Sequence, residues 1–208
     1  MIKAIETQYR GYRFRSRLEA RWAVFFDALN IKWEYEPEGY EINGYKYLPD
    51  FHLTDLGFWI EIKPTDPDKK AITKIETLEE ELKVPCFLFY GQFKLPYDDD
   101  YPWAVPAYSG KMDWPYLWCE CQDCGAMGIE FDGRSDRLPC KESYWSSVVN
   151  RGMRKVINIP AEYRIIKAGC PRHGANSDKG YNYDSPRLID AYLAAMRARF
   201  EYGESGST

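Results

Sequence analysis

The strongest constraint on the fold lies in residues 49–63, where two extended stretches flank a four-residue loop that ends in glycine. Apolar residues adjoin this loop on both sides, which predicts a β-hairpin. When Leu53 pairs with Phe58 across the loop, Asp50 falls opposite Glu61. Opposed side chains on antiparallel strands have Cβ atoms about 4.5–5.5 Å apart. The sequence therefore predicts two carboxylates that face each other in a sheet.

Two opposed carboxylates repel each other unless positive charge lies between them. A divalent cation such as Mg²⁺ or Mn²⁺ is the natural partner, because hard cations prefer carboxylate oxygen. Lys63 lies two residues beyond Glu61, so both side chains emerge on the same face of the sheet, and Ile60 and Ile62 point to the other face. A metal ion beside a lysine suits phosphodiester hydrolysis, because the metal lowers the pKa of bound water and the lysine orients or helps deprotonate that water.

The flanking sequence predicts the element order α-β-β-β-α-β over residues 1–95. Ser16 and Glu19 have the spacing of a capping box in front of an amphipathic helix. Asp66-Pro67 has the form of an N-cap followed by proline at the first helical position. The remaining predicted elements are strands 31–35, 40–42, 45–48 and 84–90, a hairpin turn at Asn43-Gly44, and a last helix that begins at Ser185-Pro186.

Three short motifs resemble those of the PD-(D/E)xK nuclease superfamily, in particular its resolvase-like and repair-nuclease-like branches. They are Leu48-Pro49-Asp50-Phe51, Ile60-Glu61-Ile62-Lys63 and the preceding helical segment Arg17-Leu18-Glu19-Ala20-Arg21-Trp22. The resemblance covers about residues 9 to 91 and implies a restriction-endonuclease-like α/β core with a mixed sheet. Pro64, directly after the lysine, departs from the family pattern and fits a strand that ends there.

The resemblance also implies roles for individual residues. Asp50 and Glu61 would bind the catalytic Mg²⁺ or Mn²⁺, with the Ile62 carbonyl as a third ligand. Glu19 would be an outer or second-metal ligand, and Lys63 would be the catalytic lysine. The other interpretation of Glu19 is that it only completes the capping box.

A second cluster of candidate metal ligands lies in the C-terminal half. Cys121 and Cys124, followed by glycine, have zinc-knuckle spacing, and Cys170 and His173, again followed by glycine, have the form of a second knuckle. These four residues predict a structural Zn²⁺ site, in which Cys140 is the substitute if His173 is not used. The 45 residues between the two knuckles imply an insertion. The alternative is a set of reduced, buried cysteines.

The charge distribution is uneven. The formal net charge is −4, which argues against nucleic-acid binding over the whole surface. A net acidic protein can still present a basic face, and arginines interleaved with aromatic residues favour contact with phosphates over a merely solvated helix face. The arginines expected to bind nucleic acid are Arg13, Arg15, Arg17, Arg21, Arg134 and Arg137.

The length of 208 residues allows one large domain or two small ones. A stretch with four prolines predicts a linker at 96–116, between a nuclease core at 1–95 and a zinc-ribbon-like region with a C-terminal helix at 117–208. No apolar run approaches the roughly 20 residues that span a bilayer. The N-terminal residues lack the apolar segment of a signal peptide, so we expect an intracellular protein without membrane contact.

These patterns together predict a metal-dependent nuclease that hydrolyses phosphodiester bonds, with DNA as the favoured substrate. Two alternatives remain open. One is a non-catalytic module that binds nucleic acid or protein on a nuclease-like fold, and the other is an RNA-directed nuclease.

Zinc binding at Cys121 can be tested by substitution. We expect Cys121→Ser to release zinc and to loosen the chain after about residue 115 while residues 10–90 stay folded, because metal affinity at such a site is folding free energy. Elemental analysis of the purified protein should find about one zinc per chain that survives exchange with magnesium. A metal-free preparation with an ordered C-terminal half contradicts the zinc prediction.

Overall fold

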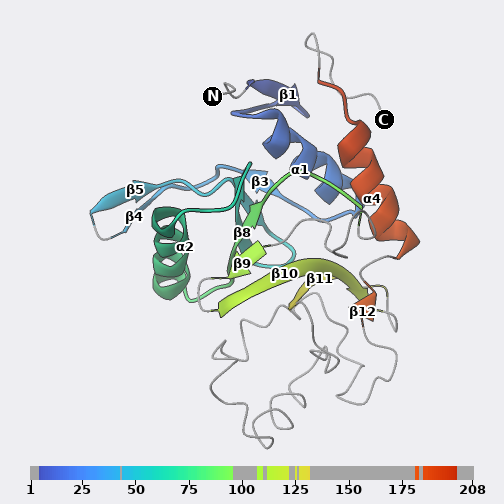
Figure 1. Cartoon of the computed structure of the whole chain (residues 1–208). Coiled ribbons are helices and arrows are strands. Elements are labelled where there is room, and N and C mark those ends of the chain that lie inside the picture. Colours follow the sequence, from blue (N-terminus) through green and yellow to red (C-terminus); the bar gives the residue numbers. More distant parts are fainter. Residues whose placement is uncertain are drawn as a thin grey trace, which may run out of the picture.

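A computed structural model of the chain has a mixed α/β fold, with three helices in the part of the chain that it describes (Figure 1). The fold class predicted from the sequence is therefore confirmed. No described helix is long and apolar enough to cross a membrane. The described residues are 5–42, 44–95, 107–109, 112–121, 125, 127–131, 181–182 and 185–200.

One large mixed sheet contains most of the described strands. Its strand order is β11-β10-β9-β8-β7-β6-β3, and β12 pairs with β10. The pair β7 and β8 is parallel and is connected through helix α2 (Lys69–Leu82), whereas the other described pairs are antiparallel. The strands are β3 (Glu34–Tyr35), β6 (Phe51–Leu53), β7 (Phe58–Lys63), β8 (Cys86–Tyr90), β9 (Ala107–Ser109), β10 (Met112–Cys121), β11 (Met127–Phe131) and β12 (Tyr181–Asn182).

The β6–β7 register is the one that the sequence predicts. Leu53 lies opposite Phe58, and Phe51 lies opposite Ile60. Asp50 immediately precedes β6, so one further step in this register brings it level with Glu61. With helix α1 (Arg17–Ala28) in front, the order α1, β3, β6, β7, α2, β8 reproduces the predicted α-β-β-β-α-β order once two small hairpins are set aside.

Ser16 caps the N-terminus of helix α1. The Glu19 N–H donates to Ser16 Oγ at 3.2 Å, which satisfies one of the free N–H groups of the first turn. Trp22, Phe25 and Phe26 recur at helical spacing and are fully buried. The predicted helix is therefore confirmed, together with the serine that starts it.

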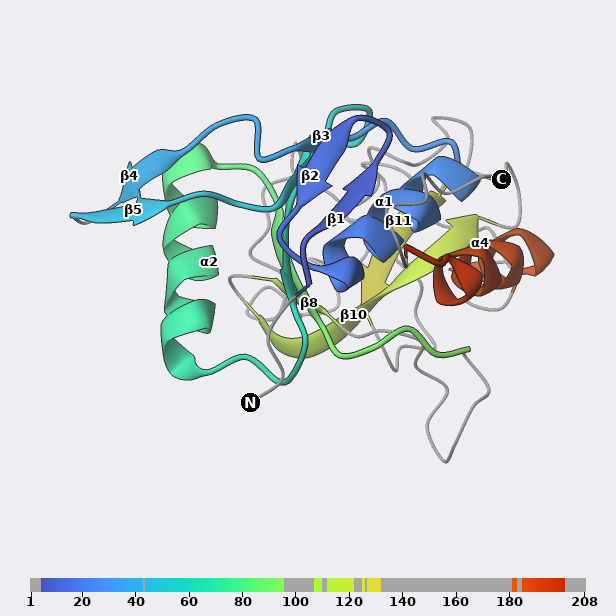
Figure 2. The ribbon, with the colours of Figure 1, turned by 90° about the horizontal axis from the view of Figure 1, so that it is seen from above.

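The two faces of the sheet are covered by different elements. Helices α1 and α4 (Pro186–Arg197) lie over one face, and α2 with the hairpin of β4 (Tyr40–Ile42) and β5 (Tyr45–Tyr47) lies over the other (Figure 2). Alternation along β7 sends Ile60 and Ile62 into the first core and Trp59 into the second. Glu61, between the two isoleucines, belongs by the same alternation to the α2 face.

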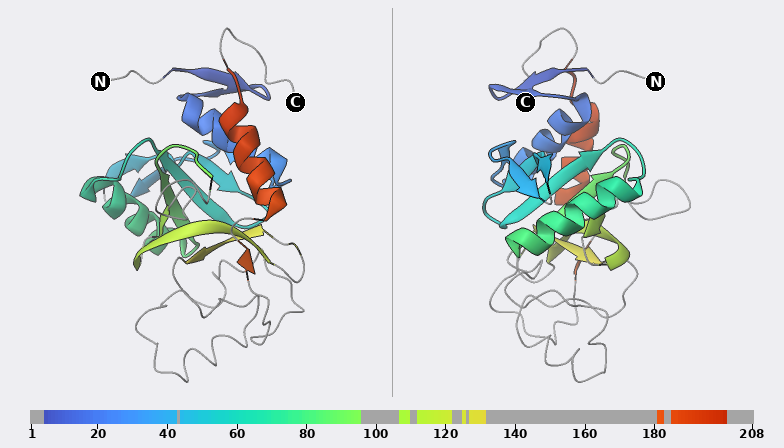
Figure 3. Two further views of the ribbon diagram at one scale, coloured as in Figure 1. Left: turned by 45° about the vertical axis from the view of Figure 1, so that its right-hand side comes forward. Right: turned by 90° about the vertical axis from the view of Figure 1, so that its left-hand side faces the viewer.

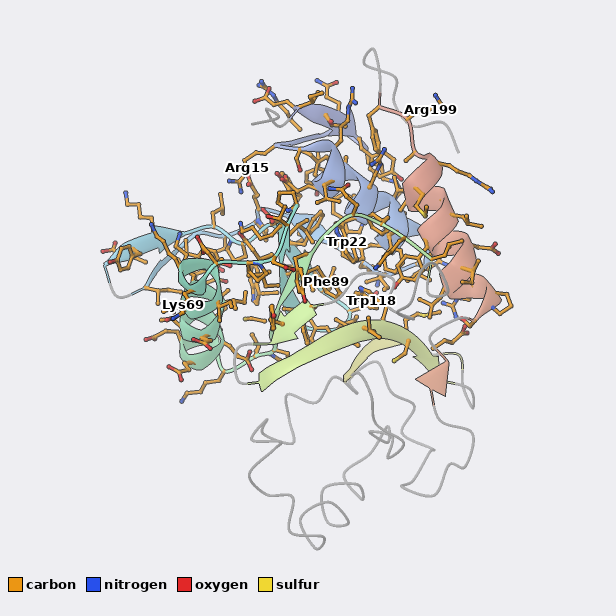
Figure 4. All side chains as sticks on the ribbon, in the orientation of Figure 1. Arg15, Trp22, Lys69, Phe89, Trp118 and Arg199 are labelled. Atoms are coloured by element: carbon orange, nitrogen blue, oxygen red, sulfur yellow. The ribbon has the colours of Figure 1, made fainter. Side chains whose placement is uncertain are left out.

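The first core joins residues that are far apart in the sequence. The ring centroids of Trp22 and Phe89 are 4.7 Å apart, and those of the stacked rings of Phe89 and Trp118 are 6.0 Å apart. The three side chains form one column between α1 and β10 (Figure 4). Helix α4 lies alongside α1 (Figure 3), where the rings of Phe25 and Tyr192 are 4.8 Å apart. The described residues of 107–200 therefore share a core with those of 5–95.

This shared core corrects two expectations. Residues 107–109 and 112–116 are strand, so the predicted linker over 96–116 is wrong at those positions. A disturbance after residue 115 would reach β10 and α4, so residues 10–90 cannot be expected to keep their fold independently of it.

Two element boundaries also differ from the prediction. Helix α2 starts after Asp68, whose side chain accepts from the Ala71 N–H at 2.8 Å, and Asp66 is not the cap. The strand predicted over 31–35 is reduced to β3. In both cases the elements exist and their ends are set by hydrogen bonds that the hydrophobic pattern does not encode.

One hairpin was missed in the sequence. Strands β1 (Thr7–Tyr9) and β2 (Tyr12–Phe14) pair across Arg10-Gly11, where φ is 48° and 81°. Two successive positive φ angles are the signature of the tight turn that favours glycine at its second position. Gly11, in a turn with Tyr9 on one side and Tyr12 on the other, is the sequence feature from which this hairpin could have been predicted.

The packing of α4 can be tested at Leu188, which is fully buried. We expect Leu188→Ala to lower the free energy of unfolding by about 2–5 kcal/mol, because it leaves a cavity in the shared core. Met196→Ala on the exposed side of α4 is the matched control and should change stability by about 0.5 kcal/mol or less. Chemical denaturation measures both. If Leu188→Ala is as stable as the wild type, the packing of α4 does not contribute to the stability of the shared core.

Candidate active site

Asp50, Glu61 and Lys63 come together at one end of the β6–β7 pair. The side chains of Asp50 and Glu61 are buried, with residue exposures of 5% and 7%, and Lys63 is half-buried beside them. The sequence therefore identified three residues that the structure brings into one cluster. Their proximity follows from the hairpin register and from side-chain alternation along β7.

Asp50 is held at two points. Its Oδ2 accepts the Ile62 N–H at 2.7 Å, so the carboxylate continues the sheet ladder one step beyond the first residue of β6. Its Oδ1 lies 3.4 Å from the Arg15 Nη2, and the same guanidinium forms an ion pair with Glu36. Arg15 comes from the segment between β2 and α1 (Figure 4), so a residue far from β6 in sequence supplies this positive charge.

Glu61 has partners on both carboxylate oxygens. The Tyr47 hydroxyl donates to Oε2 at 3.2 Å, and the Lys63 ammonium pairs with Oε1. Tyr47 belongs to the hairpin β4–β5, which folds over the α2 face of the sheet. The tyrosine was missed in the sequence, because no local pattern signals that the hairpin returns to β7.

Burial and mutual repulsion disfavour the charged form of Asp50 in the carboxylate pair. Burial raises the pKa of Asp50 well above its ordinary value, and the negative charges of Glu61 and Glu19 raise it further, against the Ile62 N–H and Lys63, which lower it. Burial by itself would lower the pKa of Lys63, but the charge and hydrogen bond of Glu61 outweigh it and raise that pKa. The cluster thus favours additional positive charge, and Lys63 stays cationic at neutral pH.

Glu19 is fully engaged in hydrogen bonds. The Ser16 hydroxyl donates to its Oε1 at 2.7 Å, and the Tyr35 hydroxyl and the Arg15 N–H donate to its Oε2 at 2.5 Å and 3.1 Å. These contacts support the capping interpretation. In a standard capping box the glutamate accepts from the backbone N–H of the capping residue, and here Glu19 accepts from the backbone N–H of Arg15 in its place. Its role as a metal ligand stays a prediction.

The predicted group of arginines divides in the structure. Arg15 reaches the carboxylates, and Arg13 pairs with the exposed Glu6. Arg17 and Arg21 instead line a separate cavity of about 410 Å³ at the junction of α1 and α4, together with Arg197 and Arg199. The arginines thus do not form one continuous strip beside the carboxylates.

The predicted zinc site lies outside the described residues. Cys124, Cys140, Cys170 and His173 are not described, and Cys121 is described only as the last residue of β10. Within the described ranges, no group of three or more His, Cys, Asp and Glu side chains has the spacing of a metal site. Arg134 and Arg137 also lie outside the described residues.

Comparisons with known proteins give no relative. No family model, no curated protein and no solved structure matches this chain significantly.

The electrostatic stress on Asp50 can be measured without substrate. Because its folded pKa is raised, the folded chain holds a proton that the unfolded chain has lost, so stability falls as pH rises above the ordinary pKa of about 3.9. Asn at position 50 keeps an acceptor for the Ile62 N–H and has no charge. We therefore expect Asp50→Asn to melt at a higher temperature than the wild type at neutral pH in chelator-treated buffer.

Thermal melts from pH 4 to pH 8 check this expectation. Relative to Asp50→Asn, the wild type should lose stability as the pH rises across that range. Asp66→Asn, outside the carboxylate cluster, is the matched control and should follow the wild type. Parallel pH profiles for the wild type and Asp50→Asn would show that the carboxylate is not strained.

Proposed function

We propose that this protein is a metal-dependent nuclease that hydrolyses phosphodiester bonds, with DNA as the favoured substrate. The observation that carries the proposal is the buried pair of Asp50 and Glu61 with Lys63 beside it. Two carboxylates and a lysine at this position resemble the constellation that the sequence motifs imply for the PD-(D/E)xK nuclease superfamily. DNA is favoured by that resemblance alone.

The residues present fit a hard divalent cation. The pKa of the buried Asp50 carboxyl is raised, and among the described residues its Oδ1 has only the Arg15 guanidinium, at 3.4 Å, as a hydrogen-bond partner. Asp50 and Glu61 would hold the ion, together with the Ile62 carbonyl. Mg²⁺ commonly takes one or two carboxylates and completes its coordination with water and phosphate oxygens, so a third acidic ligand is unnecessary. Once bound, the ion supplies Lewis-acid polarisation of the phosphate and a more acidic water.

The protein's own groups have separate tasks in this proposal. Tyr47 orients Glu61 through the hydrogen bond from its hydroxyl, and the Ile62 N–H orients Asp50. Lys63 carries a raised pKa and is cationic, so it is suited to donate a hydrogen bond to a phosphate oxygen or to the attacking water. The Arg15 guanidinium lies 3.4 Å from Asp50 Oδ1, so it is suited to contact a phosphate oxygen of a substrate bound at this cluster.

The same ion pairs favour a second candidate, a non-catalytic binding module. Arg15 bridges Asp50 and Glu36, and Lys63 pairs with Glu61, so the cluster is already partly neutralised by side chains. A structural charge network would have this appearance too. Cleavage assays separate the two functions, because only the nuclease loses an activity when one carboxylate is neutralised.

The decisive variants are Asp50→Asn, Glu61→Gln and Lys63→Ala. We expect the first two to abolish cleavage, because each removes a ligand charge, and Lys63→Ala to slow cleavage by about 10²–10⁴-fold, the usual range for acid–base assistance. Labelled single-stranded, duplex and branched DNA and RNA should be offered with Mg²⁺ or Mn²⁺. Cleavage rates measure the effect.

Asp55→Asn is the matched control, because Asp55 is an exposed acid that pairs with Lys32 on the surface. It should cleave at the wild-type rate. Calorimetric titration of each variant with Mn²⁺ separates lost ligands from lost catalysis, and Lys63→Ala should still bind the ion. Wild-type turnover in Asp50→Asn or Glu61→Gln would rule out the nuclease assignment in favour of the binding module.

A further inference from the structure

A cavity of about 400 Å³ lies between the hairpin β4–β5 and helix α2. This volume is within the usual range of ligand sites. One wall is formed by the hairpin and the other by the N-terminal part of α2. The lining residues are Ile42, Tyr45, Tyr47, Lys69, Lys70, Thr73, Lys74 and Thr77, and none of them is acidic.

The hairpin wall presents aromatic rings to the cavity. Tyr45 and Tyr47 are two residues apart on β5, so both side chains emerge on the face that meets α2. Tyr45 is 62% exposed, so the surface of its ring is free to stack. Such a ring suits a flat, polarisable ligand such as a nucleobase.

The helix wall presents uncompensated positive charge. No described carboxylate forms an ion pair with Lys69, Lys70 or Lys74. Lys69 (Figure 4) and Lys70 are the first two residues of α2, where the helix dipole disfavours cations and favours anions. The Lys74 ammonium lies 5.8 Å from the centre of the Tyr47 ring. Three cations around aromatic rings suit phosphate beside a base.

One residue connects this cavity to the candidate active site. The ring of Tyr47 lines the cavity, and its hydroxyl donates to Glu61 Oε2 at 3.2 Å. The Tyr47 side chain would therefore contact a ligand in this cavity on one side and Glu61 of the carboxylate pair on the other.

We propose that this cavity binds a nucleobase of a nucleic-acid strand that runs from the start of α2 toward the Asp50–Glu61 pair. Tyr45 stacks on the base, and Lys69, Lys70 and Lys74 hold the phosphates next to it. The proposal rests on the proposed function for its occupant, a polynucleotide strand, and adds where that strand lies and how its bases are held.

Binding to the full chain in chelator tests the proposal without cleavage. The probes are a fluorescent oligothymidylate and a strand of the same length with abasic sugars. We expect Tyr45→Ala to weaken oligothymidylate binding by about 5- to 150-fold, the usual effect of losing one stacked base. The same variant should bind the abasic strand as the wild type does, because no base is there to stack.

The lysines are tested by the salt dependence of binding. Neutralising Lys69, Lys70 and Lys74 together with glutamine should reduce the slope of log affinity against log salt by about 0.7 for each lysine. Lys46→Gln is the matched control, since Lys46 is exposed on the same hairpin and does not line the cavity. Lys46→Gln should therefore leave that slope unchanged.

Three results would overturn the proposal. The first is that the wild type does not bind oligothymidylate, and the second is that Tyr45→Ala weakens binding of the two strands equally. The third is that free thymidine monophosphate displaces the fluorescent strand at the same concentration as unlabelled oligothymidylate does. The last result would assign the cavity to a free nucleotide. Cleavage in Mg²⁺ is scored separately. Strand binding that depends on Tyr45 but is never followed by cleavage supports the cavity and contradicts the nuclease activity alone.

Discussion

The burial of Asp50 opposite Glu61 is the interaction on which the rest of this structure depends. Two carboxylates inside a sheet are unfavourable, and here they are tolerated because Ile62, Arg15, Lys63 and the Tyr47 hydroxyl surround them with donors and positive charge. Each donor comes from a different part of the chain or holds a different oxygen. The fold therefore surrounds this buried acid pair with the donors and positive charges that its burial requires.

The aromatic core explains how such a cluster is held in place. Trp22, Phe89 and Trp118 form a column that ties α1 to β8 and β10. Phe25 contacts both tryptophans of this column and also Tyr192, which joins α4 to it. Because large rings packed together resist displacement, the segment before α1 is fixed relative to the sheet. The Arg15 guanidinium can then reach the carboxylates from a hairpin-to-helix junction outside the sheet.

The two faces of the sheet thus have different tasks. The α1–α4 face supplies the larger core, and the α2 face carries Glu61, the hairpin β4–β5 and the lysine-lined cavity. Tyr47 belongs to both the smaller core and the acid cluster, so packing on this face also positions a catalytic candidate. This arrangement makes the α2 face the natural side for a bound strand in the proposed function.

The sequence by itself determined the helix that starts at Ser16, the β6–β7 register, and hence the meeting of Asp50, Glu61 and Lys63. These features depend on capping, alternation and a four-residue loop, which act over a few residues and are legible in the chain. Only the tertiary structure decided that Arg15 and Tyr47 join the carboxylates, that residues 107–109 and 112–116 extend the sheet, and that α4 completes the first core. Those contacts join segments from about 14 to more than 150 residues apart, as Tyr47 with Glu61 and Phe25 with Tyr192 show. Their partners are selected by packing and charge in space, for which the local pattern holds no signal.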